Sequence, residues 1–207
     1  MSIRNSLNDW AEYLSANPIV IADGQEHGRR GSTIDEATIR NKLIRGGFDV
    51  DKPSSSVSGE DIVCTSYPNE VIDIKVTKFC NIPRDGSNAT SSPKAITRLL
   101  TGNDASNWRN ATAKLAEGGT VNNIWYIVVC KCDPSIVMIR SIKELHPGSY
   151  VWNVANLLQI DWANEYRNGP VQRSDEEFLH LMLMGLGKCF ETRAQDTEYL
   201  RNYYRKH

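Results

Sequence analysis

The stretch Glu70-Val-Ile-Asp-Ile-Lys-Val-Thr-Lys-Phe79 decides the fold, because its side chains alternate in character along the chain. Successive side chains of a β-strand point to opposite faces, so an alternation with a period of two predicts a strand. One face of this strand carries Val71, Asp73, Lys75 and Thr77, and the other carries Ile72, Ile74 and Val76. Charged residues in the middle of such a strand need a physical reason, since burying a charge is costly.

Three further segments have the composition of strands. Asp61–Thr65 is short and rich in β-branched residues, and the turn-forming residues Tyr67-Pro-Asn69 separate it from the strand at 70–79. These two segments are therefore expected to form a hairpin or an adjacent pair of strands. Ile124–Cys130 is uninterruptedly apolar, as in a buried central strand, and Ile136–Arg140 follows it after a turn.

Helices are predicted around these strands. Residues 1–30 contain a short helical pattern with Leu7, Trp10, Ala11 and Leu14 at helical spacing. Thr33-x-x-Glu36 is a capping-box sequence, which starts a second helix that ends at Gly46-Gly47. Further helices are expected from Pro93 to Leu100, from Asn107 to Glu117 and from Ser174 to about Glu191, whereas residues 81–92 have the composition of a loop.

The order of these elements predicts an α/β fold, with a central mixed β-sheet flanked by helices and extra helices at the C-terminus. The 207 residues, of which 40% are hydrophobic, are expected to form one domain. Its core covers about 33–140, and a helical part at about 150–207 serves packing or dimerisation. No apolar run is long enough to span a membrane and no signal peptide is evident, so a soluble, cytoplasmic protein without membrane partners is expected.

The five cysteines are predicted to be packing residues. Their odd number and irregular spacing argue against a disulfide framework. Cys130 and Cys132 would share one face of a strand, which could begin a zinc site. A structural zinc site normally has CxxC-like spacing and a second pair, however, and Cys64, Cys80 and Cys189 occur singly.

Positive charge is concentrated between Lys75 and Leu115. This segment contains seven lysines and arginines but only two acidic residues, although the whole chain has a net charge of −1. The distribution of charge matters more than its total for contact with a phosphate backbone, so this segment is compatible with binding a polyanion.

Asp61, Asp73 and Lys75 form a chemically coherent set. Asp73 and Lys75 lie about 6–7 Å apart along one strand face, and the expected pairing brings Asp61 to them. Two adjacent carboxylates repel each other unless a cation lies between them, and oxygen ligands suit a hard ion such as Mg²⁺. A neighbouring lysine can position or deprotonate an attacking water and stabilise charge on a phosphate. The set is therefore suited to the hydrolysis of phosphodiesters.

The spacing of these residues resembles the motif of the PD-(D/E)xK nucleases. Gly59-Glu60-Asp61 is followed, after eleven residues, by Asp73-Ile74-Lys75, although Glu60 stands where the motif has proline. Because side chains alternate, only one of Glu60 and Asp61 can face the site, and the usual spacing to Asp73 favours Asp61 over the alternative Glu60. The resemblance implies that Asp61, Asp73 and the carbonyl of Ile74 bind Mg²⁺ and that Lys75 is the catalytic lysine. It also implies a restriction-endonuclease-like core, with Glu36 on the upstream helix as a further catalytic carboxylate.

The chain length and the C-terminal helices are most similar to those of a type II restriction endonuclease. This likeness implies a homodimer from the cytoplasm of a prokaryote, which belongs to a restriction-modification system. Such an enzyme cleaves double-stranded DNA at specific sequences with a metal-activated water, and its two-fold symmetry matches a palindromic site. The candidate DNA-binding residues are Lys78, Arg84, Asn88, Lys94, Arg98 and Arg109.

Two other functions are compatible with the same residues. The first is a structure-selective nuclease on the same fold, such as a junction resolvase or a repair nuclease. The second is a non-catalytic DNA- or protein-binding module, in which Asp73 and Lys75 only pair with each other.

Overall fold

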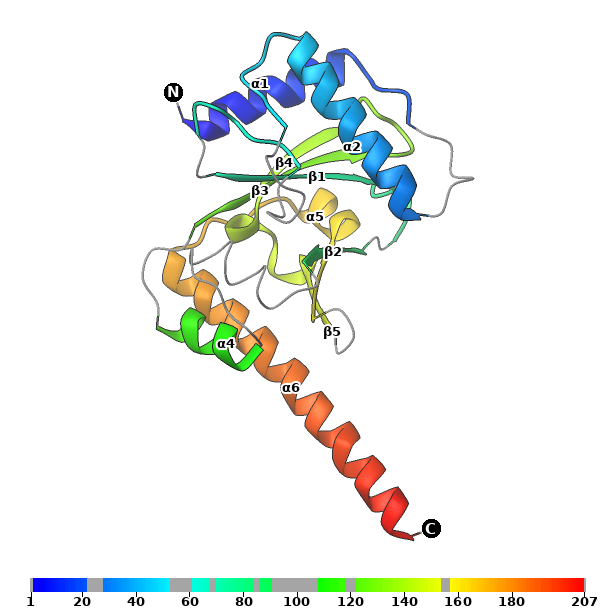
Figure 1. Cartoon of the computed structure of the whole chain (residues 1–207), viewed down its shortest axis with the longest axis vertical. Helices are drawn as coiled ribbons and strands as arrows, with labels where there is room; N and C mark the ends of the chain where they lie inside the picture. Colours follow the sequence, from blue (N-terminus) through cyan, green and yellow to red (C-terminus); the bar gives the residue numbers. More distant parts are fainter. Residues whose placement is uncertain are drawn as a thin grey trace.

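The computed structural model describes residues 2–21, 28–52, 61–67, 70–83, 86–90, 108–117, 122–153 and 157–206. Within these ranges the chain folds into α-helices and two three-stranded β-sheets (Figure 1). The α/β class and the mixed sheet predicted from the sequence are confirmed, and a second sheet is added. The helix expected from Pro93 to Leu100 lies outside the described residues. Among the helices that are described, none is long and apolar enough to cross a membrane.

The first sheet has the strand order β1-β3-β4. Its strands are β1 (Val71–Thr77), β3 (Ile124–Cys130) and β4 (Val137–Ser141). β1 and β3 are parallel and pair in register along their whole length, whereas β4 is antiparallel to β3. Every residue of β3 is buried, as its unbroken apolar sequence predicts.

The segment at 61–65 lies along the open edge of β1, as expected, but it is not a regular strand. Ile62 forms a single antiparallel bridge with Ile72, and Val63 forms another with Asp51. The pairing ends there because the chain turns, with the Ser66 N–H donating to the Asp49 carboxylate at 2.7 Å. The expected neighbour of β1 is therefore present as isolated bridges and not as a full hairpin.

The second sheet is antiparallel and has the order β2-β6-β5. Its strands are β2 (Gly86–Thr90), β5 (Tyr150–Asn153) and β6 (Leu157–Asp161). Two predictions are wrong here, because residues 81–92 are not all loop and the region 150–207 is not all helical. The Gly-Ser-Asn sequence of β2 has loop composition, and its pairing with β6, which is distant in sequence, makes it a strand.

The helices are α1 (Ile3–Ala16), α2 (Gly28–Arg45), α4 (Trp108–Ala116), α5 (Trp162–Asn168) and α6 (Asp175–Lys206), with short 3₁₀ turns η1 (Ile142–Glu144) and η2 (Pro147–Ser149). α1 and α4 agree with the predicted helices. α2 ends before Gly46-Gly47 as predicted, but it begins at Gly28, so the capping-box sequence lies inside the helix.

The start of α6 is capped as its sequence predicts, but the helix is longer than predicted. The Glu177 N–H donates to Ser174 Oγ at 3.2 Å, and the Ser174 N–H donates to Glu177 Oε2 at 2.8 Å. The helix does not end near Glu191 but continues to Lys206. Figure 1 shows this C-terminal part of α6 projecting away from the rest of the chain.

The two faces of the first sheet are covered by two apolar cores. One face, which includes Ile72 and Ile74 of β1, packs against α1 and α2 (Figure 1). The opposite face, which includes Tyr126 and Val128 of β3, packs against residues of α5, α6 and the second sheet. The principal side chains on the first face are Leu7, Trp10, Ile39 and Leu43, and those on the second are Leu158, Trp162, Phe178 and Met182.

A buried carboxylate connects α5 to both sheets. Glu165 is fully buried, and its Oε1 accepts from Arg140 Nε of β4 at 2.8 Å. Its Oε2 accepts from the His146 N–H at 2.7 Å and from Ser149 Oγ at 2.9 Å, both directly before β5. Because both of its oxygens accept from donors on different segments, this carboxylate links the region before β5 to β4.

The packing of α6 on β5 depends on one glycine, which gives a paired mutational prediction. A Cβ at Gly185 would lie 1.9 Å from the Trp152 ring, whereas a Cβ at Gly187 would meet no atom within 4 Å. We expect Gly185→Ala to destabilise the protein by about 1–3 kcal/mol through overpacking. Gly187→Ala should stabilise it by up to about 1 kcal/mol, since alanine favours the helix. Urea unfolding of both variants tests this, and equal stability of the two would contradict the packing described.

Candidate active site

Asp73 and Lys75 lie side by side on β1, on the face opposite to α1 and α2. Lys75 Nζ lies 2.8 Å from Asp73 Oδ1 and 2.7 Å from Asp73 Oδ2. Asp73 is buried, and the side chain of Lys75 is only 21% exposed. The period-two alternation of the sequence thus places these two residues together, as predicted.

Asp61 reaches the same place from the open edge of β1. Its N–H donates to the Ile72 carbonyl at 3.0 Å, and its Oδ2 accepts from the Ile74 N–H at 2.8 Å. The N–H and C=O of one residue in an extended strand point to the same edge. The carbonyl of Ile74 therefore faces the edge at which the carboxylate of Asp61 lies.

The Asp61 carboxyl group is strongly perturbed by this position. Burial raises its pKa to about 8, with further contributions from a hydrogen bond to Asp73 and from the Asp73 charge. The Ile74 N–H and the Lys75 charge act in the opposite direction but do not compensate. Asp61 and Asp73 are thus two carboxyl groups in contact. The proton kept by Asp61 prevents repulsion between two negative charges, which a bound cation could do instead.

Lys75 remains a cation in this environment. Burial alone would lower its pKa, but the charge and hydrogen bond of Asp73 and the charges of Asp61 and Glu36 raise it. Glu36, which lies on α2 and is half-buried, is therefore electrostatically part of the same cluster. The structure thus brings together the four residues Glu36, Asp61, Asp73 and Lys75 from α2, the 61–63 segment and β1.

Sequence reasoning missed one polar group beside this cluster. Tyr126 pairs with Asp73 across β1 and β3 and is completely buried, and its ring packs against Trp162 at 5.1 Å. Its hydroxyl has no hydrogen-bond partner in the described part of the chain. Burial and the Asp73 charge raise the pKa of Tyr126 well above its usual range, so it stays a neutral donor. Only the β1–β3 register could have identified it, because the apolar run around it indicates a core residue.

The candidate DNA-binding residues are described only in part. Lys78 is exposed directly after β1. Asn88 belongs to β2 and Arg109 to α4, but the described part of the chain does not include their side chains. Arg84, Lys94, Arg98 and the alternative carboxylate Glu60 lie outside the described residues.

The raised pKa of Asp61 predicts a pH-dependent stability. In the unfolded chain this carboxyl group loses its proton near pH 4, and in the folded protein near pH 8, so between these values the folded state binds more protons. Stability contributed by this group is therefore lost as the pH rises, by up to about 1.4 kcal/mol per pH unit. Asp61→Asn should remove this contribution and make the protein more stable than the wild type at pH 8.

The measurement is urea unfolding of both proteins at pH 5 and pH 8 in the presence of a chelator. The difference in unfolding free energy between variant and wild type should increase with pH. The same difference at both pH values would show that Asp61 ionises normally.

Comparison with known proteins adds no assignment to this geometry. A scan of the sequence against models of known protein families gave no match. A search of curated protein sequences gave no match either. The residues and contacts of the cluster are therefore the basis for a function.

Proposed function

We propose that this protein is a Mg²⁺-dependent nuclease that hydrolyses phosphodiester bonds of DNA. The observation that carries the proposal is the contact of the Asp61 and Asp73 carboxyl groups beside the Lys75 cation. The donors of this cluster suit a hard ion, since two carboxylates and the Ile74 carbonyl all offer oxygen. When bound, Mg²⁺ would neutralise charge on the phosphate and lower the pKa of a water molecule.

The environment of Lys75 favours a specific role for this residue. Burial acts to lower its pKa, but the contacting Asp73 carboxylate, with smaller contributions from Asp61 and Glu36, raises it, so Lys75 acts as a charge and not as a base in the resting protein. A fixed cation next to the reacting phosphate stabilises the negative charge that develops on its oxygens. Asp73, which holds Lys75 Nζ with both carboxylate oxygens, orients this cation.

A simple ion pair accounts less well for the arrangement. Asp73 and Lys75 neutralise each other without any third residue, so a structural pair would not need Asp61. The Ile74 N–H nevertheless holds Asp61 beside them, and in this position the pKa of Asp61 is raised to about 8. Groups with such perturbed pKa values are common at functional sites.

The likeness to type II restriction endonucleases leads to a more specific proposal about the substrate. The positive segment between Lys75 and Leu115 begins on β1 itself, so a polyanion bound there would meet the carboxylate cluster. We infer double-stranded DNA as the substrate and a homodimer as the active form, since cutting both strands of a palindrome requires two sites.

Cleavage of plasmid DNA tests the activity. Purified protein with Mg²⁺ should yield discrete fragments, and omission of the metal should abolish cleavage. Lys75→Ala should lower the rate by about 100-fold or more while DNA binding is retained, because one charge that stabilises the reacting phosphate is removed. Lys188→Ala, at an exposed position on α6, is the matched control and should cleave normally. Preferential cleavage of four-way junctions over duplex would instead favour the structure-selective nuclease.

Metal binding is tested separately from cleavage. Mg²⁺ at about 100 times its Kd should stabilise the wild type by about 2.7 kcal/mol, because only the folded state holds the ligands together. Asp73→Asn should lose most of this effect. If Mg²⁺ and Ca²⁺ leave the thermal unfolding of the wild type unchanged, the cluster is a structural ion pair and the protein is a non-catalytic module.

A further inference from the structure

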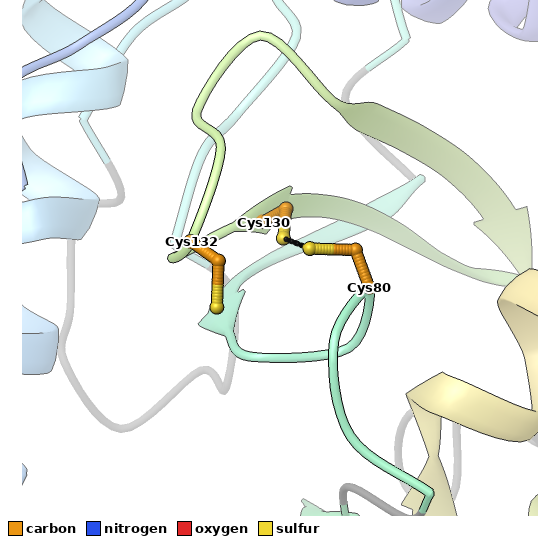
Figure 2. Close-up of side chains that lie close together, drawn as sticks. All are labelled: Cys80, Cys130 and Cys132. Carbon is orange, nitrogen blue, oxygen red and sulfur yellow. Dashed lines mark hydrogen bonds between the residues drawn. The ribbon is translucent and has the colours of Figure 1, made fainter.

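Three cysteines that are separate in the sequence meet where β1 and β3 end. Cys130 is the last residue of β3, Cys132 lies in the turn that leads to β4, and Cys80 follows β1. Their Sγ atoms all lie within 4.8 Å of one another (Figure 2). The pairing of Thr77 with Cys130, and the Lys131 N–H that donates to the Thr77 carbonyl at 2.8 Å, bring these segments together.

Packing does not explain the convergence of these thiols. Cys130 is buried and Cys80 is half-buried, but Cys132 is exposed and contributes nothing to the core. The prediction that all five cysteines are packing residues is therefore wrong for Cys132. The position of Cys132 follows from the path of the chain. Strand β3 ends at Cys130, and the turn after it places Cys132 near Cys80 (Figure 2).

We propose that Cys80, Cys130 and Cys132 bind a thiophilic divalent metal ion, Zn²⁺ being the best fit, with the fourth tetrahedral position open to water or another ligand. Soft thiolates select Zn²⁺ over Mg²⁺, and three of them can hold it in a tetrahedral site. A site of this kind is independent of the proposed nuclease activity and would exist without it.

The spacing of the sulfurs is compatible with a small adjustment on binding. Two thiolates around a tetrahedral Zn²⁺ are about 3.8 Å apart, given Zn–S distances of about 2.3 Å. The Sγ atoms of Cys80 and Cys130 are 2.7 Å apart, so they must separate by about 1 Å. Cys80 belongs to neither a helix nor a strand, so no regular backbone pairing at this residue opposes such a shift.

The turn between β3 and β4 is held in a shape that presents sulfur ligands. Ser135 donates to Asp133 Oδ1 from both its N–H, at 3.1 Å, and its hydroxyl, at 2.6 Å. The Ile136 N–H donates to the Asp133 carbonyl at 2.9 Å, which closes the turn.

The site would fix the end of the strand that carries the carboxylate cluster. Cys130 pairs with Thr77, which lies two residues beyond Lys75 on β1. A metal ion here would link the segment after β1 to β3 and its following turn, and so restrain the end of β1 at which Lys75 lies. We expect this role to be structural.

Substitution of Co²⁺ for Zn²⁺ in the full-length protein tests the proposal. The wild type, purified under reducing conditions, should contain about one Zn²⁺ per chain by elemental analysis. After removal of this metal, Co²⁺ should give the intense visible absorption and the thiolate charge-transfer band of tetrahedral sulfur coordination. Cys132→Ser should lose both signals and remain folded, since this residue is exposed, and Cys80→Ser should weaken them strongly.

Matched controls are present in the same chain. Cys64→Ser and Cys189→Ser alter the two cysteines outside the cluster and should retain the Co²⁺ spectrum. Asp73→Asn should retain it too, which separates this site from the carboxylate cluster. The proposal would be overturned if the purified wild type contained no Zn²⁺ and gave no thiolate charge-transfer band when Co²⁺ was added. A Cys80–Cys130 disulfide found by peptide mapping of protein kept under reducing conditions would also overturn it, because the pair would then be a redox couple.

Discussion

The parallel, in-register pairing of β1 with β3 is the constraint on which the rest of the structure depends. Together with the pairing of β4 on the other side, it makes β3 the buried central strand, and it leaves the other edge of β1 open to the segment at 61–63. At that edge Asp61 accepts a hydrogen bond from the Ile74 N–H, while Asp73 and Lys75 lie on the sheet face that also carries Tyr126 of β3. The pairing ends at Thr77 and Cys130, which brings Cys80 to Cys130. One strand pairing thus sets the geometry of both the carboxylate cluster and the thiol cluster.

Two carboxyl groups of this protein, Glu165 fully buried and Asp61 partly buried, differ in how their charge is compensated. Glu165 is surrounded by donors, with an arginine on one oxygen and a hydroxyl and an N–H on the other, so its negative charge is compensated within the fold. Asp61 has one N–H donor and a second carboxyl group against it, and its pKa rises to about 8. The first arrangement stabilises the fold by itself. The second is stabilised best by a cation, and this difference motivates the proposed metal-dependent function.

Local patterns were sufficient to predict much of the fold. Alternation identified β1, an apolar run identified β3, and the Ser174–Glu177 capping box located the start of α6. Prediction was wrong where distant contacts decide the structure. β2 has loop composition and becomes a strand by pairing with β6. Such pairings depend on backbone hydrogen bonds between remote segments, which composition and periodicity do not encode.

The candidate site shows the same division between sequence and tertiary structure. By itself, the sequence determined that Asp73 and Lys75 share a strand face, because side chains alternate with a period of two whatever the strand packs against. It also supplied Asp61 and Glu36 as candidates, but not their contacts. Only the tertiary structure decided that Asp61 binds the Ile74 N–H and that Cys80 lies next to Cys130 and Cys132. It also placed Tyr126, whose hydroxyl has no partner among the described residues, opposite Asp73. The physical reason is that these contacts arise from the register between strands and from the paths of turns, which the whole chain sets together.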